Sequence, residues 1–85
     1  MVSYRIFIKR SAAKEIESIP IRYRRKIVSR IQDLSNDPRP NGVKQLSGEE
    51  KYRIRQGEYR ILYKIDDAAI TVTVVKVGNR KEVYR

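Results

Sequence analysis

Residues 52–63 read YRIRQGEYRILY, a stretch with the pattern of a β-hairpin. The pair Gly57-Glu58 stands at its centre, and glycine in the first position of a two-residue loop is typical of a type II′ turn. Such a turn predicts that Arg55 lies directly opposite Arg60 in the neighbouring strand. The hairpin therefore determines the register of two adjacent strands.

Alternation of side chains along these strands separates two faces. The apolar and aromatic face, which we expect the helices to cover, holds Tyr52, Ile54, Ile61 and Tyr63. The opposite face holds Arg53, Arg55, Arg60, Leu62 and Lys64. Two arginines facing each other repel by ~0.5 kcal/mol, and an anion bound between them would turn that repulsion into attraction. Because arginine suits bidentate contact with phosphate, this face is a candidate polyanion site, with a solvated basic face as the alternative.

Upstream of the hairpin, residues 3–8 alternate as a strand with one buried face. Ser11 is expected to cap a first helix that runs to about Ile19. After Pro20, a second helix is expected from about Ile21 to Ser35. The apolar stripe of this second helix comprises Tyr23, Ile27, Val28, Ile31 and Leu34.

Downstream of the hairpin, a turn is expected at Asp66-Asp67 and a last strand from about Ala69 to Val77, where β-branched residues dominate. The resulting class is α+β in the order β-α-α-β-β-β. We expect an antiparallel sheet with a two-helix hairpin packed on one face. Residues 1–85 are expected to form a single domain.

The composition excludes several kinds of chemistry. The chain contains no cysteine and no histidine, so thiolate zinc sites, cysteine nucleophiles and histidine bases cannot form. We expect neither a metal nor a cofactor. A net charge of +10 over 85 residues favours a polyanionic partner, chiefly nucleic acid. Since no apolar run has the length of a signal peptide or a membrane span, the protein is expected in the cytoplasm and away from membranes.

The C-terminal segment carries a second group of candidate residues. Arg80 and Tyr84 follow the last strand closely, and they could reach the basic face of the hairpin if that strand is its neighbour. There Tyr84 would act as a platform for an RNA base, with packing on the sheet edge as the alternative. Lysines that could add phosphate contacts are Lys44, Lys51 and Lys81.

Two segments resemble the RelE branch of the RelE/ParE toxin superfamily. They are YRIRQGEYRILYKI at residues 52–65 and VVKVGNRKEVYR at residues 74–85. The order of strands and helices, the boundary at Asp37-Pro38 and the segment Leu46-Ser47-Gly48 agree with it. Gly-x-Tyr-Arg, followed by Val-Gly-x-Arg with a tyrosine four residues later, makes the resemblance specific.

The resemblance implies a toxin of a prokaryotic type II toxin–antitoxin pair that cuts mRNA in the ribosomal A site without a metal. The 2′-hydroxyl attacks the adjacent phosphorus and leaves a 2′,3′-cyclic phosphate. The family's transition-state arginine corresponds to Arg60, and a second arginine, which stabilises charge and the leaving group, corresponds to Arg80. A tyrosine that stacks on the substrate base, and is a candidate for proton transfer, corresponds to Tyr84.

The chain departs from the family at Arg53 and Arg55, where well-studied members carry lysines and one lysine is assigned as general base. Arginine stays protonated in proteins, so it is a poor base, but it can stabilise developing negative charge. The base is then Tyr84, a lysine such as Lys51, or water.

Two other functions fit the same pattern: a ParE-like gyrase-inhibiting toxin, and a non-catalytic RNA- or protein-binding module. The partners implied by the resemblance are a cognate antitoxin protein and the ribosome with mRNA in its A site. Operator DNA is expected to be reached only through the antitoxin.

Overall fold

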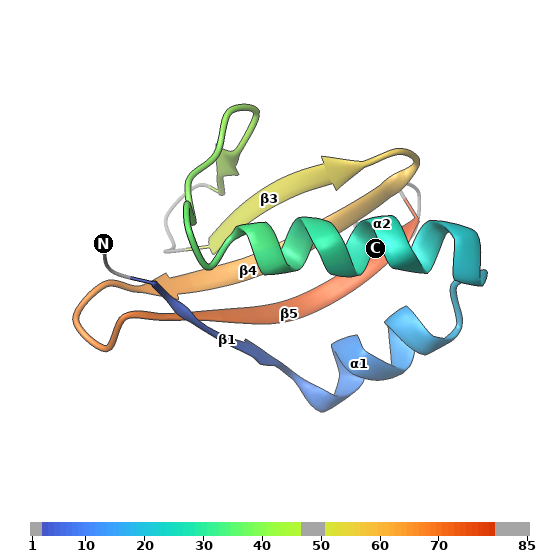
Figure 1. The fold of residues 1–85 in the computed structure, drawn as a ribbon, viewed down its shortest axis with the longest axis horizontal. Coiled ribbons are helices and arrows are strands. Elements are labelled where there is room, and N and C mark those ends of the chain that lie inside the picture. The colour runs from blue at the N-terminus through green and yellow to red at the C-terminus, as the bar shows by residue number, and fades with distance from the viewer. Residues whose placement is uncertain (1–2, 47–50, 80–85) are drawn as a thin grey trace.

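The computed structural model describes residues 3–46 and 51–79. It contains two helices and a sheet, which confirms the α+β class (Figure 1). The elements follow one another as β1 (Arg5–Ile8), α1 (Arg10–Glu17), α2 (Ile21–Asp33), β2 (Lys44–Gln45), β3 (Lys51–Gln56), β4 (Tyr59–Asp66) and β5 (Thr71–Asn79).

The strands form one sheet in the order β1-β5-β4-β3-β2. The predicted meander of β3, β4 and β5 is antiparallel. The prediction of an antiparallel sheet is wrong at one edge, because β1 pairs with β5 in parallel. The short strand β2 extends the other edge by pairing with β3. The β1–β5 pairing joins segments from opposite ends of the chain, which local alternation does not report.

The hairpin register is the predicted one, with Arg55 opposite Arg60 and Ile54 opposite Ile61. Gly57 has φ +61, whereas among the described non-glycine residues only Ile70 has a positive φ. A positive φ at the first loop residue alone is the signature of a type II′ turn. Gly57 is therefore required by the backbone of this turn.

The helices differ in detail from the prediction. Ser11 does not cap α1 but lies within it, since the helix begins at Arg10 after Lys9, which makes no side-chain capping bond. The second helix begins after Pro20 as expected and ends at Asp33. Tyr23, assigned to the buried stripe, is 40% exposed.

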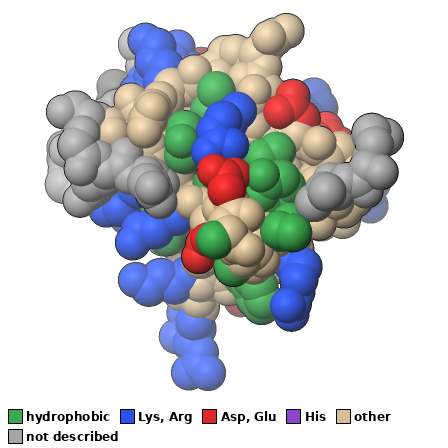
Figure 2. Space-filling model, turned by 90° about the vertical axis from the view of Figure 1, so that its left-hand side faces the viewer, with side chains coloured by type: hydrophobic (Ala, Val, Ile, Leu, Met, Phe, Trp, Pro, Cys, Tyr) green, Lys and Arg blue, Asp and Glu red, His purple; other side chains and the backbone are tan. Residues whose placement is uncertain are grey.

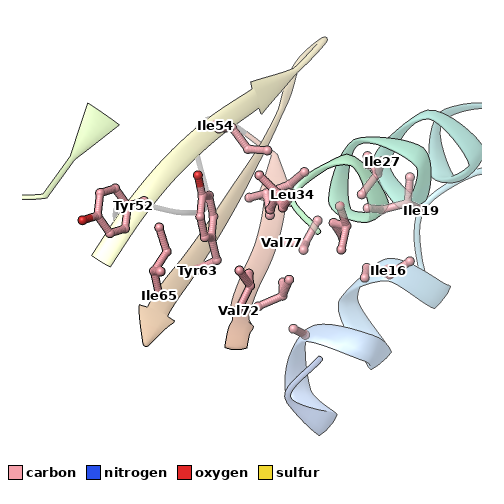
Figure 3. Close-up of a cluster of buried hydrophobic side chains, with 14 residues drawn as sticks. Ile16, Ile19, Ile27, Leu34, Tyr52, Ile54, Tyr63, Ile65, Val72 and Val77 are labelled. Atoms are coloured by element: carbon pink, nitrogen blue, oxygen red, sulfur yellow. The ribbon is translucent and has the colours of Figure 1, made fainter. Parts of the chain in front are cut away.

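The core lies between the two helices and one face of the sheet (Figure 3). The hairpin face predicted to be covered is buried, since Tyr52, Ile54, Ile61 and Tyr63 are each at most 7% exposed. The Tyr63 hydroxyl donates a 2.7 Å hydrogen bond to the Pro38 carbonyl. Burial of this ring raises the pKa of Tyr63 above its ordinary value.

A polar cluster joins the loop after α2 to the turn between β4 and β5. Asp67 accepts hydrogen bonds from both terminal nitrogens of Arg39, at 3.2 and 2.9 Å, and from the Tyr4 hydroxyl at 2.7 Å. The Arg39 guanidinium and this hydroxyl hold the pKa of Asp67 below its ordinary value. Figure 2 views this end of the molecule, where acidic, basic and hydrophobic side chains lie side by side.

Glu15 attaches α1 to the part of β5 that extends beyond β1. Its carboxylate accepts hydrogen bonds from the Val77 backbone N–H and from the Lys76 ammonium, both at 3.2 Å. This contact holds the C-terminal end of β5 in place, next to the tip of the hairpin. Within the described residues, no helix has the length and apolarity needed to cross a membrane.

Candidate functional site

A small hollow lies at the tip of the β3–β4 hairpin, on the side of the sheet away from the helices. Its volume is about 140 Å³, and its lining residues are Arg55, Gly57, Glu58, Tyr59 and Arg60. Two arginines from neighbouring strands therefore border one space. The sequence predicted this pair, and the structure brings it together.

The two arginines have different surroundings. Arg55 is exposed, whereas Arg60 is only 4% exposed. In β5, the second neighbour of β4, Arg60 pairs with Gly78. Because Gly78 has no side chain, it leaves space above the sheet for the side chain of Arg60. A buried guanidinium is held in position and acts in a medium of low dielectric constant, so its interaction with a bound anion is strengthened.

Further basic residues extend along the same face, away from the hollow. Lys44 pairs with Arg53, and Arg53 pairs with Leu62 in the next strand. Lys51 pairs with Lys64 at the far end of the hairpin. Lys51 lies four positions before Arg55, which is about 13 Å along an extended strand. The structure thus places Lys44, Arg53 and Lys51 on a basic stripe and not at the hollow itself.

Arg80, Lys81 and Tyr84 lie outside the described residues, so their predicted roles remain predictions. The last described position of β5 is Asn79, which pairs with Tyr59, the neighbour of Arg60. The strand that precedes the predicted C-terminal site residues therefore ends beside the hollow.

A larger cleft on the helix side of the hairpin tip was not anticipated from the sequence. It has a volume of about 390 Å³ and is lined by Tyr23, Lys26, Gln56, Gly57, Glu58, Tyr59 and Asn79. The rings of Tyr23 and Tyr59 lie 5.9 Å apart at 44°. Tyr23 was assigned to the core, and Tyr59 was treated only as part of the hairpin motif. Adjacent side chains of a strand point to opposite faces of the sheet. The outward position of Arg60 could therefore have been used to predict that Tyr59 faces the helices.

The arrangement can bind and stabilise a phosphate. Guanidinium groups donate hydrogen bonds in a planar fork that matches two phosphate oxygens, and they remain charged at every physiological pH. For the same reason, Arg55 and Arg60 cannot take a proton from a nucleophile. The hollow is therefore suited to charge stabilisation, and proton transfer needs another group.

Comparison with known proteins agrees with this geometry. Residues 6–84 match the family model described as the ParE toxin of the type II toxin–antitoxin system parDE. Toxin RelG of Mycobacterium tuberculosis is 31% identical over 86 residues, covering 96% of this chain and 97% of the relative. The chain belongs to the RelE/ParE superfamily of type II toxin–antitoxin toxins.

Solved structures of RelE/ParE toxins have the same fold as this toxin. A chain of the toxin–antitoxin complex RelBE2 from M. tuberculosis superposes with a TM-score of 0.83 at 32% identity, with 96% of this chain and 97% of that chain covered. A chain of the archaeal RelE–RelB complex from Pyrococcus horikoshii OT3 gives a TM-score of 0.84 at 25% identity, with 95% and 99% covered. The likeness extends over the whole RelE/ParE domain and includes the hairpin that carries Arg60.

Proposed function

We propose that this toxin is a metal-independent endoribonuclease that cleaves mRNA in the ribosomal A site. The observation that carries the proposal is the hollow where Arg55 and buried Arg60 border one space at the hairpin tip. Its size and charge suit a single phosphate group. Similarity to Toxin RelG over almost the whole chain supports a role as a toxin.

In the proposed reaction, the substrate's 2′-hydroxyl attacks the adjacent phosphorus, and the bond to the 5′-oxygen breaks. The products are a 2′,3′-cyclic phosphate and a free 5′-hydroxyl. Arg60 and Arg55 stabilise the extra negative charge on the phosphorane oxygens, and Arg80 stabilises the departing 5′-oxygen. Tyr84 stacks on a neighbouring base.

One proton must leave the 2′-hydroxyl and one must reach the 5′-oxygen. The separation of about 13 Å along the strand disfavours Lys51 as the base at the hollow. Tyr84 or a water molecule is therefore the better candidate for the general base. Orientation of the mRNA by the ribosome would supply much of the rate acceleration, so cleavage of free RNA is expected to be weak.

The proposed partners follow from the relatives and from charge. The M. tuberculosis and P. horikoshii relatives were solved as toxin–antitoxin complexes. With a net charge of +10, this toxin would bind a cognate antitoxin through an acidic or amphipathic segment, in the cytoplasm where ribosomes are found. Operator DNA would be bound through the antitoxin. The phosphates of the RNA would be contacted by Lys44, Arg53 and Lys81.

A ParE-like gyrase inhibitor is the second candidate, because the matching family model is the one described for parDE toxins. Inducible expression, with mapping of mRNA 5′ ends and of DNA breaks, separates the two. We expect cuts that follow the codon period in translated mRNA. Gyrase-linked DNA breaks without mRNA cuts would contradict the proposal in favour of gyrase. Absence of both, with normal growth, would indicate a non-catalytic binding module.

A further inference from the structure

The cleft between α2 and the hairpin tip has the features of a second nucleic-acid contact. We propose that it binds a base of single-stranded RNA next to the cleaved phosphate, with the adjoining phosphates on α2. The inference rests on the proposed function, because it requires an RNA substrate. It assigns a role to residues that the proposed mechanism leaves unused.

The first support is the aromatic wall formed by Tyr23 and Tyr59. With centroids 5.9 Å apart, the two rings contact each other directly, so a base stacks on the wall and not between them. The Arg22 guanidinium lies 4.7 Å from the centre of the Tyr23 ring. Tyr23 is 40% exposed, which leaves its ring accessible to a ligand.

The second support is the polar lining of the same cleft. Gln56 and Asn79 place side-chain amides beside the rings, and amides can both donate to and accept from the edge of a base. The cleft volume of about 390 Å³ accommodates a small organic ligand. Aromatic stacking combined with polar contacts to base edges is the usual mode of single-stranded RNA recognition.

The third support is a basic groove that continues from the cleft along α2. It is lined by Arg25, Lys26, Ser29, Arg30, Asp33 and Gln56, so it shares Lys26 and Gln56 with the cleft. Three cations and one carboxylate give the groove a positive balance. A nucleic acid fits this combination better than an apolar peptide segment, since the phosphates beside a stacked base need cations within reach.

The cleft also adjoins the hollow of Arg55 and Arg60, because Gly57, Glu58 and Tyr59 line both. The space around the hairpin tip between them is open, because a Cβ at Gly57 would meet no atom within 4 Å. Figure 1 shows the N-terminal half of α2 and the β3–β4 turn at the same end of the molecule. One RNA strand can therefore pass over the turn, with its cleaved phosphate on one side and a neighbouring base on the other.

The test uses binding of a fluorescein-labelled 2′-O-methyl hexauridylate, which cannot be cleaved, to the full-length toxin. Tyr23→Ala is expected to weaken binding by about 5- to 150-fold, the range for loss of one stacked base. Tyr23→Phe keeps the ring and is expected to bind as the wild type does. A matched oligomer lacking its bases should bind the wild type as weakly as the hexauridylate binds Tyr23→Ala.

The groove is tested by salt dependence. The three cations of the groove are expected to contribute about −2 to the slope of log K against log salt for a single strand. Arg25→Gln with Arg30→Gln should reduce the magnitude of that slope by about 1.4. Unchanged binding by Tyr23→Ala, or equal binding of the base-free oligomer, overturns the inference. Loss of affinity for the antitoxin alone in Tyr23→Ala overturns it too, since the cleft would then be a protein-docking site.

Failure of the cleft assignment can be distinguished from failure of the nuclease proposal by measuring both RNA binding and mRNA cleavage. Arg60→Lys should lower ribosome-dependent cleavage by about 10²- to 10³-fold, whereas the remaining affinity for the hexauridylate should still depend on its bases. If the wild type binds through Tyr23 but never cuts mRNA, the cleft assignment stands and the nuclease proposal fails. If mRNA cleavage proceeds and Tyr23→Ala binds normally, the nuclease proposal stands and the cleft assignment fails.

Discussion

Arg55 lies directly opposite Arg60 across the β3–β4 pair, and both side chains border one hollow of about 140 Å³. Like charges in facing positions destabilise a sheet. A sheet selected for stability alone would place an acidic residue at one of them. If this hollow binds an anion as we propose, the pairing leads to one prediction on stability and one on catalysis.

The first prediction concerns stability. Arg55→Glu creates an opposite-charge pair with Arg60 and is expected to raise the free energy of unfolding by about 0.5 kcal/mol, while it removes toxicity. Urea denaturation at low salt measures the gain, and added salt should reduce it. A less stable Arg55→Glu variant would show that the two arginines do not repel each other in the folded protein.

The second prediction concerns catalysis. Arg60→Lys keeps the positive charge but loses the planar fork, and we expect ribosome-dependent mRNA cleavage to fall by about 10²- to 10³-fold. Arg80→Ala should also abolish growth arrest. The matched control is Lys64→Ala, an exposed basic residue on the same strand and face, which should remain toxic. Full toxicity of both arginine variants would refute the site assignment.

The third prediction concerns the buried hydroxyl of Tyr63. Tyr63→Phe leaves the Pro38 carbonyl without its 2.7 Å partner, at a cost of about 1 to 2 kcal/mol in unfolding free energy. The control is Tyr52→Phe, the stacked neighbour, which loses only a long contact of 3.4 Å with Arg39. Equal losses of unfolding free energy in Tyr63→Phe and Tyr52→Phe would contradict a stabilising role of the hydrogen bond from Tyr63 to the Pro38 carbonyl.

The fourth prediction concerns acid. In the folded protein, the pKa of Asp67 is lowered by Arg39 and Tyr4, so its contribution to stability is complete above about pH 4, the unfolded value. That contribution is lost as the pH falls through the lower folded pKa. Melting temperatures measured from pH 7 to pH 2 should therefore depend less on pH in Asp67→Asn than in the wild type. Glu17→Gln, on the exposed side of α1, serves as the control.

The fifth prediction concerns the turn before β5. Ile70 has φ +53, a left-handed conformation that costs a β-branched residue roughly 1 to 2 kcal/mol. Ile70→Asn should raise the free energy of unfolding by about 1 kcal/mol, because asparagine tolerates this conformation. Ile70→Val keeps the branched carbon and should bring no gain. A destabilised Ile70→Asn variant would mean that the contacts of Ile70 outweigh its backbone strain.

Local patterns in the sequence predicted much of this fold. The Gly57-Glu58 turn determines which residues of β3 and β4 face each other, because a two-residue loop allows one register. Alternation then separates the buried tyrosines from Arg55 and Arg60. The end of the first helix before Pro20 follows from the ring of proline, which cannot continue a helix.

Tertiary structure alone decided the rest. Parallel pairing of β1 with β5 and the meeting of Tyr23 with Tyr59 join segments far apart in the chain. Periodicity reports which face a side chain occupies, but it carries no information about which distant element covers that face. The sequence by itself thus determined the pair of arginines, whereas only packing of α2 against the hairpin produced the cleft beside them.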